Sequence, residues 1–163
     1  MNLRLHLKGI QGFSYIEMVF TVAILALLAT AVMPYAELAV TRKKETELKR
    51  DLREIRTAID AYKKAADSGR ILKLANESGY PKSLNDLVMG VEDMTDPLKK
   101  KIYFLRRLPT DPMFPKQNET PSLTWGQRSY DSPPDYPQQG VDVFDIYSLS
   151  SQKGLNGVPY KQW

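Results

Sequence analysis

The sequence predicts an α+β fold in which one long N-terminal α-helix packs against a small globular head. An uncharged and mostly apolar stretch occupies residues 18–36, soon after a short basic leader. Apolar residues then recur at helical spacing up to residue 66. The last third of the chain is rich in proline, glycine and aromatic residues, which is typical of turns and short strands. We therefore expect a helix with a membrane-spanning first half and an amphipathic second half, and a head with short helices and a small antiparallel β-sheet.

The apolar stretch is long enough to cross a membrane. It holds nineteen residues, and a helix needs about 20 to cross the hydrocarbon of a bilayer. The only charge within residues 13–36 belongs to Glu17. An ordinary secretory signal has an apolar core of roughly 7 to 15 residues and no acid within it. Because residues 29–31 form an A-x-A pattern, a conventional signal peptide is the alternative.

The helix is predicted to continue well beyond the apolar stretch. Apolar residues recur every three or four positions in its second part, at Leu48, Leu52, Ile55, Ile59, Tyr62 and Ala66. Such a stripe forms one face of an α-helix and packs into a core. We therefore predict one helix over residues 13–67, with residues 37–67 as its amphipathic part. Ser68 and Gly69 end the helix, and residues 68–163 form the head.

Two short helices are expected at the start of the head. Ser83 is placed to cap the first, which stops at Gly90 and carries Leu84, Leu87 and Val88. The second is predicted over residues 96–108, with Pro97 in its first turn. Its buried face consists of Ile102, Phe104, Leu105 and Leu108. A solvated surface is expected for its cations, with a lipid-headgroup or partner site as the alternative: Lys99, Lys100, Lys101, Arg106 and Arg107.

Two strands are predicted in the proline-rich last third of the chain. Residues 123–130 form one candidate, and residues 141–149 form the better one because most are β-branched or aromatic. Paired as an antiparallel ribbon, the strands would cover the apolar stripe of the helix. The tail after residue 149 is predicted to be a loop, with Trp163 at the edge of the head.

Composition weighs against most enzyme classes. The chain has no cysteine, and its one histidine, His6, lies in the leader. The rest of the chain therefore lacks the usual general base and the commonest metal ligands. The carboxylate pairs Asp93 with Asp96 and Asp131 with Asp135 lie in proline-rich surroundings, where aspartate is a routine turn residue. We expect no catalytic residue and no enzyme activity.

The charge pattern bears on partners and on orientation. The net charge is +4, and it falls to +2 without Arg4 and Lys8 of the leader. This is too small to indicate nucleic-acid binding. Basic and acidic residues alternate just after the apolar stretch, which is typical of a solvated helix face. Because this flank holds more lysine and arginine than the leader, the positive-inside rule favours a cytoplasmic C-terminal part.

Gly12, Phe13 and Glu17 in the motif GFSYIE, the apolar stretch and Pro34 together resemble the class III signal of type IV pilins and pseudopilins. The resemblance implies that residues 1–12 are a leader, removed when a prepilin peptidase cuts after Gly12. The same enzyme would methylate Phe13, the new N-terminal residue. The resemblance also implies a cytoplasmic leader and an external head, against the charge rule. We follow the resemblance, because the processing site has no evident purpose in the opposite orientation.

Glu17 and Pro34 are the two special positions of the apolar helix. An acid inside a membrane is costly and requires a partner. The amine freed at Phe13 of a neighbouring subunit is such a partner, because a buried ion pair can fix register; the alternative is a position at headgroup depth without a specific role. Pro34 leaves the carbonyl of Thr30 without its helical donor. The resemblance implies a break between residues 26 and 34 in the filament, and a gentle kink is the alternative.

Five blocks of the head resemble the G-type major pseudopilin of type II secretion: YPKSLNDLV, LRRLPTDPM, TWGQRSY, VFDIYSL and GLNGVPYKQW. Many such pseudopilins bind calcium in the C-terminal loop through carbonyls and aspartates. Here that loop reads SSQKGLNGVPY and has no acid, whereas calcium prefers several hard oxygen ligands. Asp142 and Asp145 lie nearby, but on an alternating strand they do not point to a common site. We expect no metal and no other cofactor, and packing of Tyr160 and Trp163 in place of an ion.

The resemblance implies a structural subunit that polymerises into the periplasmic pseudopilus, anchored by a single pass in the bacterial inner membrane. The expected partners are further copies of the chain, prepilin peptidase, minor pseudopilins and the inner-membrane assembly platform, and indirectly the secretion ATPase, the secretin and exoproteins. One alternative is a type IV pilin or minor pilin for adhesion, motility or DNA uptake, although this chain cannot form the disulfide of many pilins. Another is a membrane-anchored periplasmic binding module that uses the aromatic and proline-rich segment after Pro109.

Overall fold

The fold is α+β, as predicted, in a computed structural model that describes residues 12–116 and 118–163, apart from the side chains of residues 31–33. The chain divides into two compact units, Met1–Val40 and Thr41–Trp163. The second, which we call the head unit, combines helical elements with two small antiparallel sheets. The sequence leads us to expect one such sheet, so the second is a correction.

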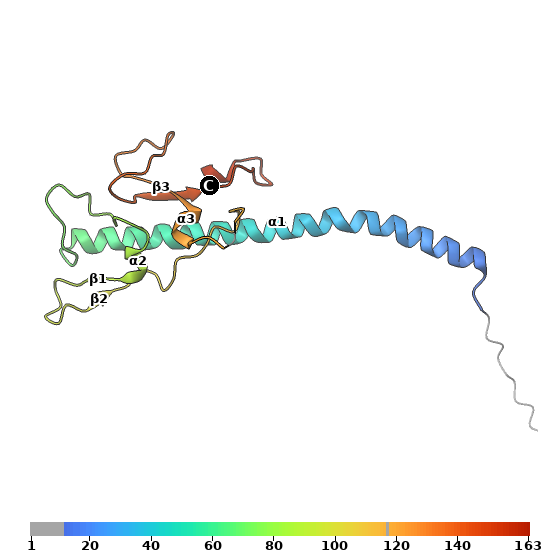
Figure 1. Ribbon diagram of the computed structural model, residues 1–163, viewed down its shortest axis with the longest axis horizontal. Helices are drawn as coiled ribbons and strands as arrows, with labels where there is room; N and C mark the ends of the chain where they lie inside the picture. The colour runs from blue at the N-terminus through green and yellow to red at the C-terminus, as the bar shows by residue number, and fades with distance from the viewer. Residues whose placement is uncertain (1–11, 117) are drawn as a thin grey trace, which may run out of the picture. The chain divides into compact units, whose positions relative to one another are not determined.

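Helix α1 (Tyr15–Asp67) is 53 residues long and continues through Pro34 (Figure 1). The helix predicted over residues 13–67 is confirmed, with a start two residues later and the same end. The predicted apolar stripe is buried at every position, with exposed fractions of 8% or less at Leu48, Leu52, Ile55, Ile59, Tyr62 and Ala66. These side chains belong to the one hydrophobic cluster of the head unit, so this face of α1 forms the base of the core.

The end of α1 is fixed by its backbone. Gly69 adopts a φ of 75°, which glycine does without steric strain. The N–H of Gly69 donates to the carbonyl of Ala66 at 3.1 Å, and the N–H of Arg70 donates to the carbonyl of Ala65 at 2.9 Å. This pair of bonds satisfies carbonyls that the helix end would leave free. The predicted stop at Gly69 is confirmed.

Strands β3 (Trp125–Arg128) and β4 (Asp145–Ser148) form an antiparallel ribbon beside α1 (Figure 1). The pairing predicted from the sequence is confirmed, although both strands are shorter than expected. Trp125 and Ile146 are buried in the same cluster as the apolar stripe, so the ribbon covers the stripe as predicted. Residues 123 and 124, expected in the strand, belong instead to the helical turn α3 (Pro121–Thr124), which starts with proline.

The helix predicted over residues 96–108 is wrong. The segment forms a turn and then β2 (Lys101–Ile102), which pairs antiparallel with β1 (Val91–Glu92). The carboxylate of Asp96 accepts the N–H of Leu98 at 2.9 Å. Such a bond from an aspartate to the backbone two residues on stabilises a turn and competes with a helix.

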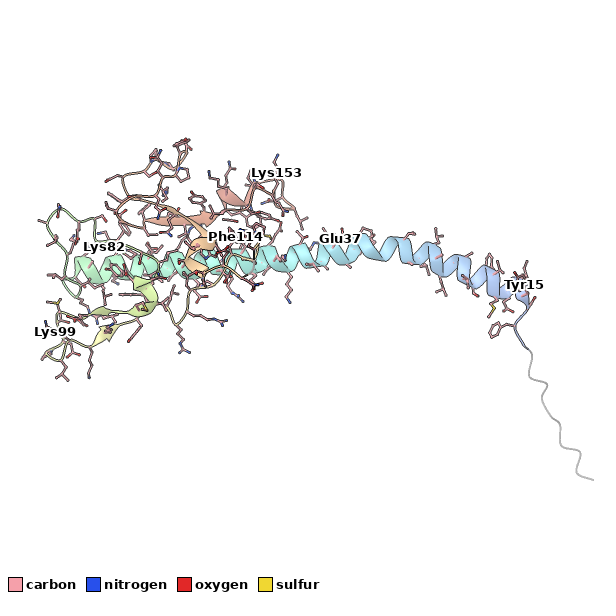
Figure 2. The ribbon with its side chains drawn as sticks, viewed as in Figure 1. Tyr15, Glu37, Lys82, Lys99, Phe114 and Lys153 are labelled. Carbon is pink, nitrogen blue, oxygen red and sulfur yellow. The ribbon has the colours of Figure 1, made fainter. Side chains whose placement is uncertain are left out.

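The rest of that segment follows the same non-helical course. Lys99, labelled in Figure 2, has a φ of 48°, which lies in the left-handed region that lysine rarely adopts. Beyond β2, the N–H groups of Phe104 and Leu105 donate to the carbonyl of Leu87 at 3.0 and 2.9 Å. These bonds hold Leu105 in the core by pairing with another segment, so its burial is confirmed while its helix is not.

The first predicted helix of the head exists but is shorter. Helix α2 (Asp86–Met89) begins three residues after Ser83, which therefore does not cap it. Instead the N–H of Ser83 donates to the carboxylate of Asp86 at 2.9 Å. The helix ends at Gly90, as expected. The tail predicted as a loop contains a short 3₁₀ turn, η1 (Tyr160–Gln162).

Candidate functional site

The first candidate site is the apolar part of α1, residues 15–36, which we call the apolar helix segment. It lies in the one described helix that is long and apolar enough to cross a membrane. No residue of its most apolar window is buried by the rest of the described chain. A soluble protein rarely leaves a surface of this kind uncovered. The described part of the chain therefore leaves this apolar surface uncovered.

Glu17 lies in the first turn of α1, four residues after Phe13. Its carboxylate has no ion pair with any residue in the described part of the chain. An acid in the first turn interacts favourably with the helix dipole, which stabilises it locally in water. That interaction does not supply a full counter-charge in a bilayer. The structure thus presents one carboxylate, without a cation, at the end of a bare apolar helix.

The predicted cleavage bond between Gly12 and Phe13 lies just outside this helix. Both residues precede Tyr15, the first helical residue, and Phe13 is 82% exposed. The bond therefore lies outside the helical backbone of α1. Of the predicted leader, residues 1–12, only Gly12 falls within the described residues, and the remainder lies outside them.

Pro34 lies inside α1 without interrupting it. One turn earlier, the hydroxyl of Thr30 donates to the carbonyl of Leu27 at 2.7 Å. Because proline has no N–H, the carbonyl of Thr30 loses its usual helical donor. The break expected between residues 26 and 34 refers to the assembled filament, and it stays a prediction.

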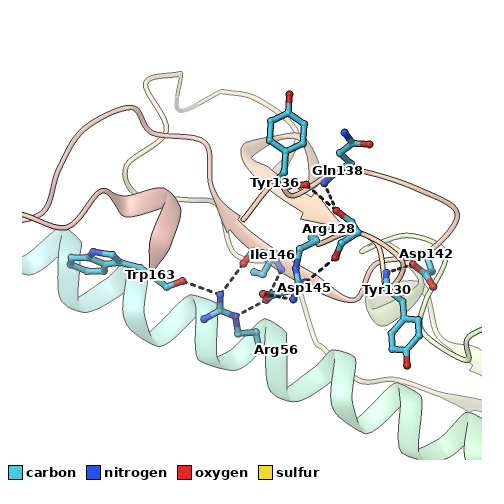
Figure 3. Close-up of polar contacts among 10 residues, drawn as sticks. Arg56, Arg128, Tyr130, Tyr136, Gln138, Asp142, Asp145, Ile146 and Trp163 are labelled. Carbon is cyan, nitrogen blue, oxygen red and sulfur yellow. Dashed lines mark hydrogen bonds and ion pairs between the residues drawn. The ribbon is translucent and has the colours of Figure 1, made fainter. Parts of the chain in front are cut away.

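The second candidate site joins α1 to the C-terminal tail (Figure 3). Arg56 Nε donates to Asp145 Oδ1 at 2.8 Å. Arg56 Nη2 donates to the main-chain oxygens of Ile146 and Trp163 at 3.0 and 2.9 Å. A guanidinium holds several acceptors at once in a fixed plane, which a lysine ammonium does not. One side chain of the helix thus fixes both β4 and the end of the tail.

Glu45 makes a second link between α1 and the tail. Its Oε1 accepts the N–H of Leu155 at 2.7 Å and the hydroxyl of Tyr160 at 3.0 Å. Burial and the neighbouring Glu45 carboxylate together raise the pKa of Tyr160 to about 12. The ring of Tyr160 meets that of Trp163 edge to face, with centroids 5.0 Å apart. The predicted packing of Tyr160 with Trp163 is confirmed.

The donor set around the tail does not fit calcium. The tail loop offers no carboxylate of its own, and Glu45 Oε1 already accepts two hydrogen bonds from it. Asp145 is engaged by Arg56 and by Arg128, whose Nη2 lies 3.6 Å from Asp145 Oδ2. Within residues 12–116 and 118–163, no group of three or more metal-ligating side chains gathers. Calcium prefers six to eight oxygen ligands, and the described side chains around the tail do not provide such a set.

Asp142 joins two segments that are distant in sequence. It accepts the hydroxyl of Ser129 at 2.6 Å, the N–H of Tyr130 at 2.9 Å and the hydroxyl of Ser78. Although burial opposes ionisation, these hydrogen bonds hold the pKa of Asp142 below its usual value. Asp142 therefore links the loop at Ser78 to the segment of Ser129 and Tyr130.

Sequence patterns did not mark Arg56 and Glu45. Both belong to the run of alternating charges assigned to a solvated helix face. Their partners lie 89 and 110 residues away in the chain, at Asp145 and Leu155. No local pattern encodes a contact at that separation, so only the tertiary fold reveals these two residues.

No family model, curated protein or solved structure matches the chain. The functional assignment therefore depends on the chain's own residues. Every buried side-chain nitrogen and oxygen in the described part has a hydrogen-bond partner, which is typical of a structural core. The bare apolar helix segment with Glu17 is the feature that packing within one chain does not explain.

Proposed function

We propose that the chain is a pseudopilin-like structural subunit that polymerises into the periplasmic pseudopilus of a type II protein secretion system. The subunit waits in the inner membrane with its head in the periplasm. Prepilin peptidase cuts after Gly12 and methylates Phe13. The assembly platform then adds subunits together with minor pseudopilins, driven by the cytoplasmic ATPase. Growth of the filament moves exoproteins through the secretin.

One observation carries the proposal: a single carboxylate, without a cation among the described residues, stands at the start of a bare apolar helix, four residues after a glycine–phenylalanine bond. Cleavage of that bond creates an amine at Phe13. On a neighbouring copy this amine can neutralise Glu17, which removes the cost of an unpaired acid in an apolar environment. The ion pair between Glu17 and the Phe13 amine would then set the axial spacing between neighbouring subunits.

Burial of the apolar helix segments against one another supplies the surface for assembly. Lipid chains are as apolar as leucine, so the hydrophobic effect between helices is weak in a membrane. Close packing and the ion pair must therefore choose the arrangement. The head unit, fixed to α1 through Arg56 and Glu45, moves into the filament together with its helix.

Deletion of the gene in the native bacterium tests the proposal, with the full chain supplied in trans as the control. We expect deletion to abolish exoprotein secretion, and complementation to restore it. Recovery of processed chain in sheared surface fibres, with normal secretion after deletion, would instead indicate a pilus. A monomer that keeps residues 1–12 and never polymerises would indicate an anchored binding module.

A further inference from the structure

The head unit carries a groove of about 660 Å³ between α1 and the segment that follows β2. We call it the arginine groove. Its less polar lining consists of Thr57, Ala58, Ala61, Phe104 and Leu105. Its charged lining consists of Arg50, Arg53, Glu54, Arg106 and Arg107. Four cations and one acid thus surround a mostly apolar floor.

Three of these arginines are free to bind a partner. Arg50 is engaged, since its Nη2 donates to Asp51 Oδ1 at 3.1 Å. The side chains of Arg53, Arg106 and Arg107 are exposed, and none makes a hydrogen bond or ion pair with another described residue. Guanidinium groups pair with carboxylates and stack on aromatic rings. The groove therefore fits an acidic segment that also carries an aromatic side chain.

The chain itself carries a segment of this chemistry in residues 130–140, which we call the acidic loop. The loop contains Asp131 and Asp135 and has no lysine or arginine. Both carboxylates are exposed, and neither has a hydrogen bond or ion pair in the part of the chain that the structure describes. Tyr136 is 70% exposed and points away from α1 (Figure 3). The loop thus presents two free acids and the exposed ring of Tyr136.

The acidic loop is held in one conformation before any partner binds. Ser129 N–H donates to the carbonyl of Gln138 at 2.9 Å, and Gln138 N–H donates to Ser132 Oγ at 2.7 Å. Arg128 Nη1 donates to the carbonyl of Ser132 at 3.2 Å. Three prolines restrict the backbone further, at 133, 134 and 137. A segment ordered in advance loses less entropy on binding.

We propose that the acidic loop of one copy docks into the arginine groove of a second copy. Tyr136 lies on the apolar floor, while Asp131 and Asp135 pair with the free arginines. The loop and the groove share no residue, so the contact is heterologous. In a row of bound copies, the first copy keeps a free groove and the last copy keeps a free loop, or the reverse. Contacts of this kind build open-ended filaments. The proposal rests on the proposed polymerisation and adds the head contact to it.

Crosslinking in the assembled full-length protein tests the docking. The chain has no cysteine, so two single-cysteine variants can be co-expressed: Thr57→Cys in the groove and Pro134→Cys in the loop. A short bismaleimide should give a covalent dimer in the mixture and in neither variant alone. The matched control pairs Thr57→Cys with Leu74→Cys, an exposed position outside the loop, and should give no dimer.

Charge reversal sharpens the test. Arg106→Glu with Arg107→Glu in the groove variant should reduce the mixed dimer by about tenfold, because like charges then face each other. Asp131→Arg with Asp135→Arg in the loop variant should restore it. The control Lys99→Glu with Lys100→Glu makes the same charge change outside the groove and should have no effect. If the groove reversal reduced the mixed dimer and the loop reversal did not restore it, the proposed pairing of the loop acids with the groove arginines would be wrong.

The outcomes separate the two proposals. Sedimentation of polymer and the mass of the processed chain report assembly independently of the crosslink. Polymer that starts at Phe13 but gives no Thr57–Pro134 dimer would overturn the docking and leave the proposed function standing. Absence of any polymer would overturn both. A mixed dimer that responds to charge reversal and to rescue would establish the contact.

Discussion

At the scale of single residues, Glu17 has no ion pair among the described residues, and we propose that its charge acts in the contact between subunits. Its carboxylate lies at the start of α1, where it interacts favourably with the helix dipole. In an apolar bundle the same carboxylate needs a full counter-charge. The Phe13 amine of a neighbour is the nearest group of the right sign that processing creates. If the chain is processed and assembled as proposed, the charge of Glu17 matters after cleavage and in the assembled state.

The Glu17→Gln variant should be processed normally but should fail to polymerise, because it keeps the shape of the side chain and loses its charge. Sedimentation of crosslinked membranes measures the polymer, and intact mass measures processing. Thr21→Val is the matched control, since it changes an uncharged side chain one turn further along and should assemble. If Glu17→Gln formed polymer normally, the proposed ion pair between Glu17 and the Phe13 amine would be wrong.

Asp93 allows a pH test of the head unit. Its carboxylate accepts bonds from Arg70 Nε at 3.1 Å and from the N–H of Thr95 at 3.0 Å. The Arg70 guanidinium, helped by Thr95, lowers the pKa of Asp93 from 3.8 to about 2. A lowered pKa means that ionised Asp93 stabilises the fold at pH values above its unfolded pKa. This contribution is lost as the pH falls through the folded value.

Asp93→Asn should therefore lower the melting temperature at neutral pH, and the difference from the parent should shrink as the pH falls from about 4 to about 2. Thermal unfolding of the detergent-solubilised full chain at a series of pH values measures this. The exposed Asp60→Asn serves as a control and should show no such trend. A gap that stayed constant down to the lowest pH would show that ionisation of Asp93 does not stabilise the head unit.

At the scale of elements, Arg56 connects α1 with β4 and the tail. Arg56→Gln loses the ion pair with Asp145 and leaves acceptors at Ile146 and Trp163 without their donor. We expect the free energy of unfolding to fall by about 1 to 2 kcal/mol, since the side chain is 38% exposed and partly screened. Denaturant titration measures the change.

Arg53 provides the matched control for Arg56. It lies one turn earlier on the same helix, and its side chain is exposed and without a partner in the described chain. Arg53→Gln should change the free energy of unfolding by less than about 0.5 kcal/mol. Equal effects of the two variants would mean that the link from α1 to the tail does not contribute to stability.

Pro34 marks where α1 is predicted to open in the filament. The helix is continuous through Pro34 in the single chain, so the expected break belongs to assembly. Pro34→Ala restores an N–H for the carbonyl of Thr30 and should oppose the break. Amide hydrogen exchange of residues 26–34 in polymer should be faster in the parent than in the variant. Equally slow exchange in both would show that the helix stays closed.

The elements also show what a sequence can predict. The stripe from Leu48 to Ala66, the stop at Gly69 and the pairing of β3 with β4 follow from local periodicity and backbone preference, and each is confirmed. The helix prediction for residues 96–108 failed because the Asp96 carboxylate accepts the N–H of Leu98, which favours a turn. The contacts of Arg56 and Glu45 escape prediction because they arise only when distant segments meet.

At the scale of the whole molecule, the chain divides its tasks between two units. The first exposes an apolar helix that the described residues leave uncovered. The second satisfies its buried polar groups and, in the described residues, fixes its own tail through Arg56 and Glu45. The head unit therefore has a packed core of its own, whereas the apolar helix segment lacks packing partners among the described residues. Under the proposed function, polymerisation of processed copies would supply the missing cover.

The N-terminus of the native protein tests this account most directly. Intact mass and N-terminal sequencing of the chain from inner membranes should give a protein that begins at Phe13 and carries one added methyl group. A start at Phe13 creates the amine that Glu17 requires. A chain that begins at Met1, or that is cut after the A-x-A pattern at residues 29–31, would contradict the account, because no amine would then face the acid.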